Sequence, residues 1–408
     1  MKNLLRLFMI LFAAAFLFSA CEGPMGPAGA DGNDGTDGKD ANETCKLCHN
    51  SDGVIATANE YKHSMHFMGE AYEEGTRNYC APCHSNQGFL DVVKNNTPAT
   101  ITVNPSDPTK FINNYVVSAS ALAFPGAIGC FTCHSSLHTN YAATEFLPLT
   151  STAAVPMTMW GGSKSINFTK TSANLCAKCH QPRPITASSG ALIDYSKLIS
   201  EPTANYTLSS ISFRTGVHYG TQAAMASGTG GIEFGNGYEN SAHKNGASCS
   251  ACHMAAPSGF TGGHSFVAAG NFNGCNATGC HTSMSASNAA LTGVMEDIDL
   301  KLAELGSELD LIATPSILQK DPVTGEFTGY FDIYDPGSNA SGKYKSPSTN
   351  GYTTDQRNYN NTLPSLPPIT NAQFGAFINF ALVLRDGSHG VHNYPYIKKL
   401  LENTLAAI

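Results

Sequence analysis

The sequence is short of charged residues and, over most of its length, of amphipathic segments. Only 13% of its 408 residues are charged, and the formal net charge is -8. Proteins that bind nucleic acid carry clusters of Lys and Arg, so this balance argues against a nucleic-acid partner. Long amphipathic segments are missing before residue 285. A chain long enough for two or three ordinary domains therefore lacks, in most of its length, the usual means of building a core.

The same region has instead a repeated cysteine pattern. Five cysteine pairs are spaced C-x-x-C and followed at once by His, and a sixth pair has four residues between its cysteines and the same following His. His is 14 of 408 residues, so a His behind all five C-x-x-C pairs has a chance probability on the order of 10⁻⁸. In chain order, the first to sixth motifs are Cys45–His49, Cys80–His84, Cys130–His134, Cys176–His180, Cys249–His253 and Cys275–His281.

This unit is the attachment motif of c-type haem. Its two thiols form thioethers with the vinyl groups of a haem, and the His that follows binds the iron as the proximal ligand. Six covalent haems are therefore predicted. The predicted attachment residues are Cys45, Cys48, Cys80, Cys83, Cys130, Cys133, Cys176, Cys179, Cys249, Cys252, Cys275 and Cys280. The predicted proximal ligands are His49, His84, His134, His180, His253 and His281.

Three other uses of paired cysteines compete with this interpretation. Disulfides are common in cysteine-rich exported chains, and zinc sites use C-x-x-C pairs, but neither requires a His after every pair. Iron–sulfur clusters need a third or fourth cysteine nearby, which is missing here. The wider spacing of Cys275 and Cys280 leaves a disulfide open at the sixth motif, although multihaem cytochromes, which the pattern resembles, also use that spacing.

Haem would supply the core that the polypeptide lacks. From Cys45 to His281 there is one motif per roughly 40 residues, and a porphyrin offers more apolar area than any side chain. We predict a mostly α and irregular fold: a multihaem cytochrome c core of loops and short helices wrapped on haems, with minor β structure and long C-terminal helices. Short β-like runs stand at residues 101–103 and 115–117.

The N-terminus predicts export and lipid anchoring. Lys2 and Arg6 flank the start of an apolar run that ends at Phe18, which is typical of a secretory signal over residues 1–20. The following Phe18–Cys21 resembles a bacterial lipobox, and Cys21 is the one cysteine of 13 that no motif uses. We therefore predict a lipid anchor at Cys21 on the outer membrane, at the cell surface or facing the periplasm. An uncleaved signal-anchor helix is the alternative, but the apolar run is short for a membrane span.

Residues 21–44 are predicted to hold the haem domain away from the membrane. Six triplets place Gly at every third position from Gly23 to Gly38, a collagen-like period. So few triplets favour a flexible acidic tether over a triple helix. The hexahaem domain is then expected at 45–281 and a helical C-terminal segment at 282–408.

Helical periodicity returns after the sixth motif. Apolar residues recur every three or four positions over 291–312, before Pro315, and again over 374–384, where Gly387 predicts the end of the helix. A third helix is predicted to begin after Asn393, with Pro395 in its first turn. Between the first two helices, residues 315–368 form a polar stretch that is predicted to be a long loop.

A low-spin haem needs a second axial ligand. Of the 14 His, eight remain after the six proximal ones. The segments that end at His66 and His243 resemble the Y-x-x-S-x-H element that supplies distal ligands in multihaem cytochromes. Each such His lies so near a motif in sequence that we expect it to serve a neighbouring haem. His63 is an open alternative to His66. Methionine ligation by Met65, Met68 or Met254 is a further alternative.

Asp386–Asn393 resembles the D-x-S-x-G-x-H-N element near the C-terminus of pentahaem nitrite reductases. That resemblance implies that His392 is a haem ligand, and His389 is taken as a loop residue. The chain as a whole is similar to the nitrite reductase, hydroxylamine oxidoreductase and cell-surface multihaem cytochromes, over the motifs and roughly residues 215–281 and 370–408. The distal ligands that these resemblances imply are His66, His138, His218, His243, His264 and His392.

Two functional classes follow from the resemblance. In the first, every haem has two His ligands, and the protein passes electrons to a partner cytochrome or an extracellular acceptor; self-association into a filament is a variant. In the second, one five-coordinate haem reduces a small nitrogen or sulfur compound. Such reductases commonly mark the active haem with a proximal Lys or with crosslinks, whereas all six proximal positions here are His. We favour the electron carrier, with no catalytic residue.

Overall fold

The computed structural model describes residues 51–122, 124–134, 149–159, 164–183, 193–206, 217–312, 316, 318–321, 323–331 and 369–408. The signal peptide, Cys21, the tether, the first motif (Cys45, Cys48 and His49) and His138 lie outside these residues. All the described residues belong to one unit of the chain, Cys48–Ile408. Within them, no helix is long and apolar enough to cross a bilayer.

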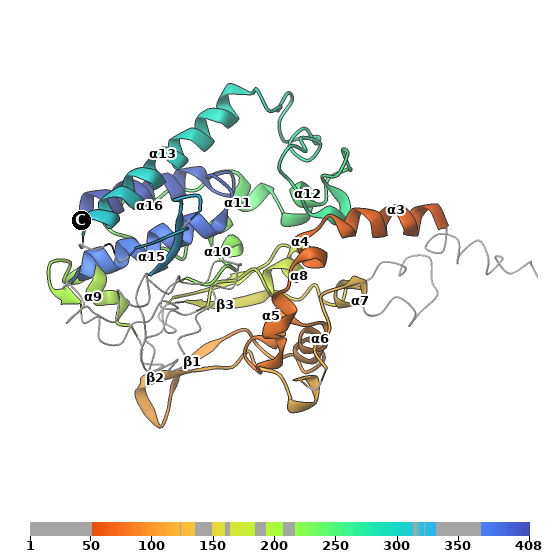
Figure 1. Ribbon diagram of the computed structural model, residues 1–408, viewed down its shortest axis with the longest axis horizontal. Coiled ribbons are helices and arrows are strands. Elements are labelled where there is room, and N and C mark those ends of the chain that lie inside the picture. The colour runs from red at the N-terminus through yellow and green to blue at the C-terminus, as the bar shows by residue number, and fades with distance from the viewer. Residues whose placement is uncertain are drawn as a thin grey trace, which may run out of the picture. The chain divides into compact units, whose positions relative to one another are not determined.

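The region that contains the second to sixth motifs is built from short helices (Figure 1). The α-helices are α3 (Ser51–Lys62), α4 (Met65–Met68), α5 (Ala81–His84), α6 (Asn86–Lys94), α7 (Cys130–Cys133), α8 (Ala173–Ala177), α9 (Tyr195–Ser200), α10 (Gln222–Ala226), α11 (His243–Gly246) and α12 (Cys249–His253). The 3₁₀ helices are η1 (Ala71–Thr76), η2 (Ala119–Leu122) and η5 (Gly263–Ser265). Four of the α-helices, α5, α7, α8 and α12, contain motif residues.

The strands form small antiparallel pairs, each a two-stranded sheet. The pairs are β1 (Ile101–Asn104) with β2 (Asp107–Asn113), β3 (Val155–Met159) with β4 (Lys164–Phe168), β5 (Asn205–Tyr206) with β8 (Ile369–Thr370), and β6 (Leu318–Lys320) with β7 (Phe327–Phe331). The predicted mostly helical class with minor β structure is confirmed at this level. The β6–β7 hairpin stands inside the stretch that was predicted to be one long loop.

One predicted strand is present and the other is not. Residues 101–103 lie in β1, as predicted, whereas residues 115–117 follow the end of β2 and form no strand. The side chain of Asn113 accepts a hydrogen bond from the backbone N–H of Tyr115 at 2.9 Å, which turns the chain out of the ladder. Tyr115 and Val117 instead pack against Ala81 and Val92 in a small buried cluster.

The three predicted C-terminal helices are all present: α13 (Ala289–Leu311), α15 (Asn371–Asp386) and α16 (Tyr394–Ala407). Helix α15 begins with a capping box in which Thr370 and Gln373 exchange hydrogen bonds, and it ends at Gly387 with a φ of 65°. A left-handed backbone at that position is the geometry that favours glycine. Helix α16 follows Asn393 and has Pro395 in its first turn.

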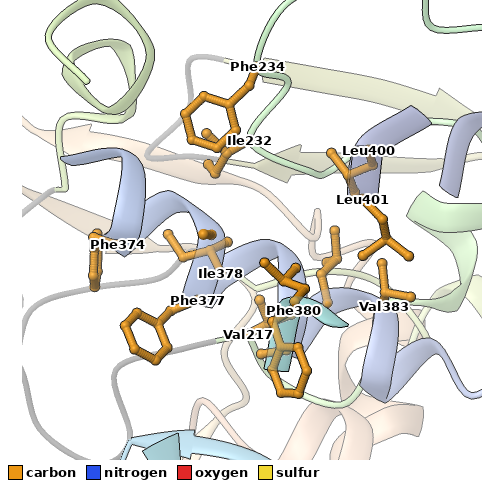
Figure 2. Packing of buried hydrophobic residues seen from close by; sticks show 14 of the residues in the cluster. Val217, Ile232, Phe234, Phe374, Phe377, Ile378, Phe380, Val383, Leu400 and Leu401 are labelled. Carbon is orange, nitrogen blue, oxygen red and sulfur yellow. The ribbon is translucent and has the colours of Figure 1, made fainter. Parts of the chain in front are cut away.

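These helices carry the main hydrophobic core (Figure 2). Phe374, Phe377 and Phe380 of α15 pack with Leu400 and Leu401 of α16 and with residues from the earlier segment 193–234. Nearly every side chain of α15 is buried, which is why its sequence is apolar on all sides. The one buried amide in its middle, Asn379, bonds the backbone N–H and C=O of Ile232 at 2.7 and 2.8 Å. The last helices are thereby fixed to the chain that precedes the fifth motif.

Candidate metal centres

The four C-x-x-C-H motifs among the described residues are single helical turns. In the second, third and fourth motifs the backbone N–H of the His donates to the carbonyl of the first Cys, four residues earlier, and α12 contains the whole fifth motif. Residues at positions i, i+3 and i+4 of a helical turn share one face, so both thiols and the imidazole lie on the same side. The bonds are His84 to Cys80 at 3.1 Å, His134 to Cys130 at 2.9 Å and His180 to Cys176 at 2.9 Å.

The sixth motif reaches a similar closure despite its longer spacing. The N–H of His281 donates to the carbonyl of Cys275 at 3.0 Å, so the extra residues loop out between them. The loop is held from outside, because the side chain of Asn276 bonds the backbone of Met284 at 2.7 and 3.0 Å. Cys275 and Cys280 are free thiols, as are the other eight cysteines of the described residues. The disulfide alternative for this motif has no counterpart in the structure.

Each of the five described proximal His lies opposite a second His. In every case the partner is one of the distal ligands that the resemblance implied, and we name each pair after the motif that supplies its proximal member. The centroid separations are 5.9 Å for His84 and His218 (second-motif pair), 6.4 Å for His134 and His264 (third), 6.0 Å for His180 and His66 (fourth), 6.3 Å for His253 and His392 (fifth) and 6.0 Å for His281 and His243 (sixth).

These separations match two imidazoles on opposite sides of one metal ion. A His nitrogen binds a transition metal at about 2 Å, and a ring centroid lies about 1 Å behind that nitrogen, which places two such centroids about 6 Å apart. The five observed distances run from 5.9 to 6.4 Å. The spacing is too wide for stacked rings and too narrow for a side chain between them, but it fits an iron with the plane of a porphyrin between the rings.

The δ nitrogens of these imidazoles are anchored by the protein. Ligand His residues usually donate Nδ1–H to a backbone carbonyl or a carboxylate, which fixes the tautomer and directs Nε2 to the metal. Five of the ten paired His have such a bond. The bonds are His84 to Ala71 O at 2.8 Å, His180 to Gln222 Oε1 at 3.1 Å, His243 to Val391 O at 2.8 Å, His253 to Phe266 O at 2.8 Å and His392 to Asp386 Oδ1 at 2.8 Å.

Burial keeps several of these imidazoles in the neutral form that binds a metal. Burial, followed by the neighbouring His180, lowers the pKa of His66 to about 4. Burial, followed by the charges of Arg183, His84 and Arg385, lowers the pKa of His218 to about 3. Desolvation disfavours the charged imidazolium at such positions. Both side chains are therefore neutral at pH 7.

The pairing joins each distal His to a motif other than its nearest one in sequence. His66 precedes the second motif but lies opposite His180 of the fourth. His243 precedes the fifth motif but lies opposite His281 of the sixth. This is the arrangement expected for a His too close to a motif to reach across the porphyrin that the motif holds. A metal bound between the two rings would link separate segments of the chain at each pair.

The two His residues that the sequence left ambiguous have other contacts. The ring of His63 lies 4.4 Å from that of Phe260, while His66 takes the place opposite His180. The structure thus favours His66 of the two. His389 bonds Asp299 Oδ1 at 2.7 Å on an exposed surface, consistent with its prediction as a loop residue.

The segment Asp386–Asn393 contacts α11, α12 and the residues just before α11. Its Val391 carbonyl anchors His243 of the sixth-motif pair, and its His392 belongs to the fifth. Asn393 accepts a hydrogen bond from Ser241 N–H at 2.8 Å and donates to Asn240 Oδ1 at 2.9 Å. The two sequence elements that resemble parts of multihaem cytochromes are therefore bonded to each other.

The second and fourth motifs face each other. The thiol of Cys83 points to the carbonyl of Lys178 at 3.7 Å, and the thiol of Cys179 points back to the carbonyl of Pro82 at 3.9 Å. The proximity of the two thiols lowers the pKa of Cys83 and raises that of Cys179. The attachment edges of two haems would thus lie against each other.

The fourth and fifth motifs make a similar contact. Helix α8 contacts α12, and the hydroxyls of Ser172 and Ser250 lie 3.1 Å apart. The proximity of the thiols of Cys176 and Cys249 raises the pKa of Cys176 and lowers that of Cys249. Of the two cysteines of the fourth motif, Cys179 therefore lies toward the second motif and Cys176 lies toward the fifth.

Several residues at these sites were not found from the sequence. Gln222 anchors His180, and Phe266, a non-glycine residue at a φ of 57°, anchors His253 through its carbonyl while its ring lies 5.1 Å from that of His66. Such a strained backbone at a candidate site is a common sign of functional constraint. Nothing in the local sequence of these residues marks them, because their roles arise from contacts between distant segments.

The polar atoms around the second motif also fit a haem. The hydroxyl of Tyr115 and Nε of Arg385 are buried without a hydrogen-bond partner in the part of the chain that the structure describes. Tyr115 lies near the thiols of Cys83 and Cys179, whose charges, after burial, raise its pKa. A buried polar atom usually has a partner, and the propionates of a haem are acceptors of the right kind.

No family model matches the chain, and neither the curated proteins nor the solved structures contain a significant match to it. The assignment therefore depends on the chain's own residues. Each described motif offers two thiols on one side of a turn and a His with a second His opposite. Taken together, these residues would hold one haem c at each motif, attached through the thiols and ligated by the His pair.

Proposed function

We propose that this protein is a hexahaem c-type cytochrome that carries electrons and catalyses no bond chemistry. The observation that carries the proposal is the set of five His pairs, in which every described C-x-x-C-H or C-x₄-C-H motif has a second imidazole about 6 Å from its own. Chance would not pair each proximal His with a different distal His.

Two ligands per iron suit electron transfer. An iron that keeps both axial ligands changes charge on reduction without exchanging a ligand, whereas a catalytic haem needs an open axial position for its substrate. At the five described motifs a His stands where a substrate would bind. Two imidazoles, with no methionine, also favour low reduction potentials.

The motif contacts support electron passage from haem to haem. Cys83 and Cys179 each lie against a backbone carbonyl of the other's motif, which brings the second and fourth motifs together, and α8 and α12 bring the fourth and fifth together. The edges of three porphyrins would therefore lie close to one another, and the fourth haem would stand between the second and the fifth.

The remaining ligands belong to the first motif. The five pairs use His66, His218, His243, His264 and His392. Of the distal ligands that the resemblance implies, His138 is left for His49. We therefore propose His138 as the second ligand of the first haem.

We place the protein at the outer membrane, attached by a lipid on Cys21 and separated from it by the glycine-rich tether. Its partner would be another cytochrome or an extracellular electron acceptor. Replacing Cys21 by Ser should release a soluble protein that still carries all its haems, because anchor and cofactors use different cysteines. A variant that stays with the membrane would indicate an uncleaved helix.

The spin state of the oxidised full-length protein tests the function. We expect the intact mass to show six haems, the spectrum to be wholly low-spin, and carbon monoxide to leave the reduced spectrum unchanged. One high-spin haem that binds carbon monoxide, together with turnover of nitrite, hydroxylamine or tetrathionate, would instead establish the reductase. A mass with five haems and loss of none on Cys275→Ser would remove the sixth motif from the count.

A further inference from the structure

Helix α15 ends with two consecutive residues of opposite charge, and both are buried. Arg385 is 9% exposed and Asp386 is 5% exposed. Burying a charged side chain costs free energy unless the charge is paired and hydrogen-bonded. The two side chains diverge, so that each lies beside a different His pair.

Arg385 lies next to the second-motif pair. Its guanidinium stacks between two aromatic rings, 4.8 Å from the centroid of Tyr219 and 4.3 Å from that of Tyr330. Tyr219 directly follows His218, and their ring centroids are 6.3 Å apart. Nη2 donates to the carbonyl of Gly329 at 3.2 Å. Among the described residues no carboxylate forms an ion pair with Arg385, so its positive charge is not cancelled there.

Asp386 lies next to the fifth-motif pair. Its side chain is 1% exposed, and its Oδ1 accepts a hydrogen bond from Nδ1 of His392 at 2.8 Å. The hydroxyl of Ser388 donates to its other oxygen. A carboxylate in this position makes the imidazole a stronger electron donor to its metal.

The other anchored imidazoles have weaker partners. His84, His180, His243 and His253 each bond a neutral carbonyl oxygen. Next to the third-motif pair, Glu60 lies 3.7 Å from His264 and its side chain is 26% exposed, so solvent screens its charge. The strongest buried charges are thus at the second-motif and fifth-motif pairs, and their signs are opposite.

We infer that Arg385 and Asp386 shift the reduction potentials of two haems in opposite directions. Electrons would then run from the fifth-motif haem through the fourth to the second. The inference rests on the proposed function. Reduction adds one negative charge to a haem, which a nearby cation favours and a nearby anion opposes. Arg385 therefore raises the potential of the second-motif haem, whether its charge acts on the iron or on a propionate of the same haem. Asp386 lowers the potential of the fifth, and the motif contacts join these haems through the fourth.

Reduction potentials of the full, haem-loaded protein test this directly. In a spectroelectrochemical titration, Arg385→Gln should move one high-potential step downward, and Asp386→Asn should move one low-potential step upward. We expect each shift to change the ratio of reduced to oxidised haem about tenfold, which is 59 mV for a one-electron couple. Arg385→Lys and Asp386→Glu keep the charge and should keep the step near its original position.

Asp299→Asn is the matched control. Asp299 makes the same bond to a His as Asp386 does, but to His389 on the exposed surface, and its loss should move no step. Every variant is first checked for six haems and a wholly low-spin spectrum, so a failure of the proposed function is seen before any potential is measured. Unchanged steps in both charge-removing variants, or shifts of the opposite sign, would overturn the inference.

Discussion

The motif region, residues 51–281, and the C-terminal helices, residues 289–408, are held together in different ways. Helices α13, α15 and α16 bury one large apolar cluster with the segments that pass beneath them. Within the described residues, the motif region contributes its segment 193–234 to that cluster and otherwise has two small clusters, each of a few buried residues. The comparison shows that the C-terminal helices and segment 193–234 share one apolar core, whereas the rest of the described motif region has little apolar core of its own and contains the His pairs.

Both regions expose some large apolar side chains, since Leu300, Leu311 and Val323 are 71, 76 and 86% exposed, but those of the motif region include residues at the motifs themselves. In the motif region large apolar residues stand uncovered next to the motifs, including Phe131 within the third and Tyr79 directly before the second. Met65, Phe124 and Phe260 are 74, 85 and 73% exposed. Covering such residues with a porphyrin would release about 25 cal/mol per Å² of apolar surface. The haems are therefore expected to be the largest single source of stability in this region.

Producing the protein without haem should have the largest effect, and the effect should differ between the two regions. We expect the full chain, produced without haem attachment, to lose ordered structure over the described residues of 51–183 and 239–281, because two small clusters do not offset the entropy of ordering so many residues. Helices α13, α15 and α16 should keep slow hydrogen exchange. Equal protection of both regions in the haem-free protein would contradict this account.

A substitution in the large core should have the next largest effect. Phe380 is 1% exposed and packs edge-on against Phe327, so Phe380→Ala should lower the free energy of unfolding by about 3–5 kcal/mol. The measurement is denaturant unfolding followed by helix content, with Phe124→Ala as the exposed control, whose change should be within about 0.5 kcal/mol. A small effect at Phe380 would mean that haem also supports the C-terminal helices.

Local patterns in the sequence predicted what depends on neighbouring residues. The motifs, the three C-terminal helices, the end of α15 at Gly387 and the start of α16 at Asn393 follow from spacing of a few residues, whereas the Thr370 cap of α15 was not predicted. The false strand at 115–117 shows the limit, because one side-chain bond from Asn113 ended the ladder. Strand propensity does not reveal such a competing bond.

Pairing of the His residues could not be predicted in the same way. Which distal His meets which motif depends on contacts between segments more than a hundred residues apart, as for His84 and His218 or His134 and His264. Arg385 is another example. Its sequence context is an ordinary basic residue in the last turn of a helix, and only the packing of α15 shows that it is buried beside a His pair.

Removing a distal ligand should show how the two regions depend on each other, because the fifth-motif pair has one His in each region. His392→Ala should convert one of six haems to a high-spin form that binds carbon monoxide, and the same is expected for His243→Ala in the sixth-motif pair. Optical and electron paramagnetic resonance spectra measure both. His389→Ala and His63→Ala are the controls and should leave all haems low-spin. A high-spin haem in either control would reassign the ligand.

The smallest expected effect is at the surface of the C-terminal helices, where pH rather than haem controls the contacts. Asp297 of α13 accepts a hydrogen bond from Tyr394 at 2.8 Å and lies 3.4 Å from Lys398 and 3.7 Å from Lys301. Burial raises the pKa of Asp297, but together these three partners lower it by more than burial raises it, so the pKa is below its ordinary value.

A carboxyl whose pKa is lower in the folded state stabilises the fold above its unfolded pKa and loses that contribution as pH falls through the folded value. The contribution of Asp297 should therefore be complete above about pH 5 and be lost progressively as the pH falls below about pH 4. Because the site is partly exposed and screened by salt, Asp297→Asn should cost no more than about 1 kcal/mol at pH 7. Unfolding measured from pH 7 to pH 3 should show wild type and Asp297→Asn converge at the acid end. A difference that does not change between pH 7 and pH 3 would mean that the charge of Asp297 is not its source.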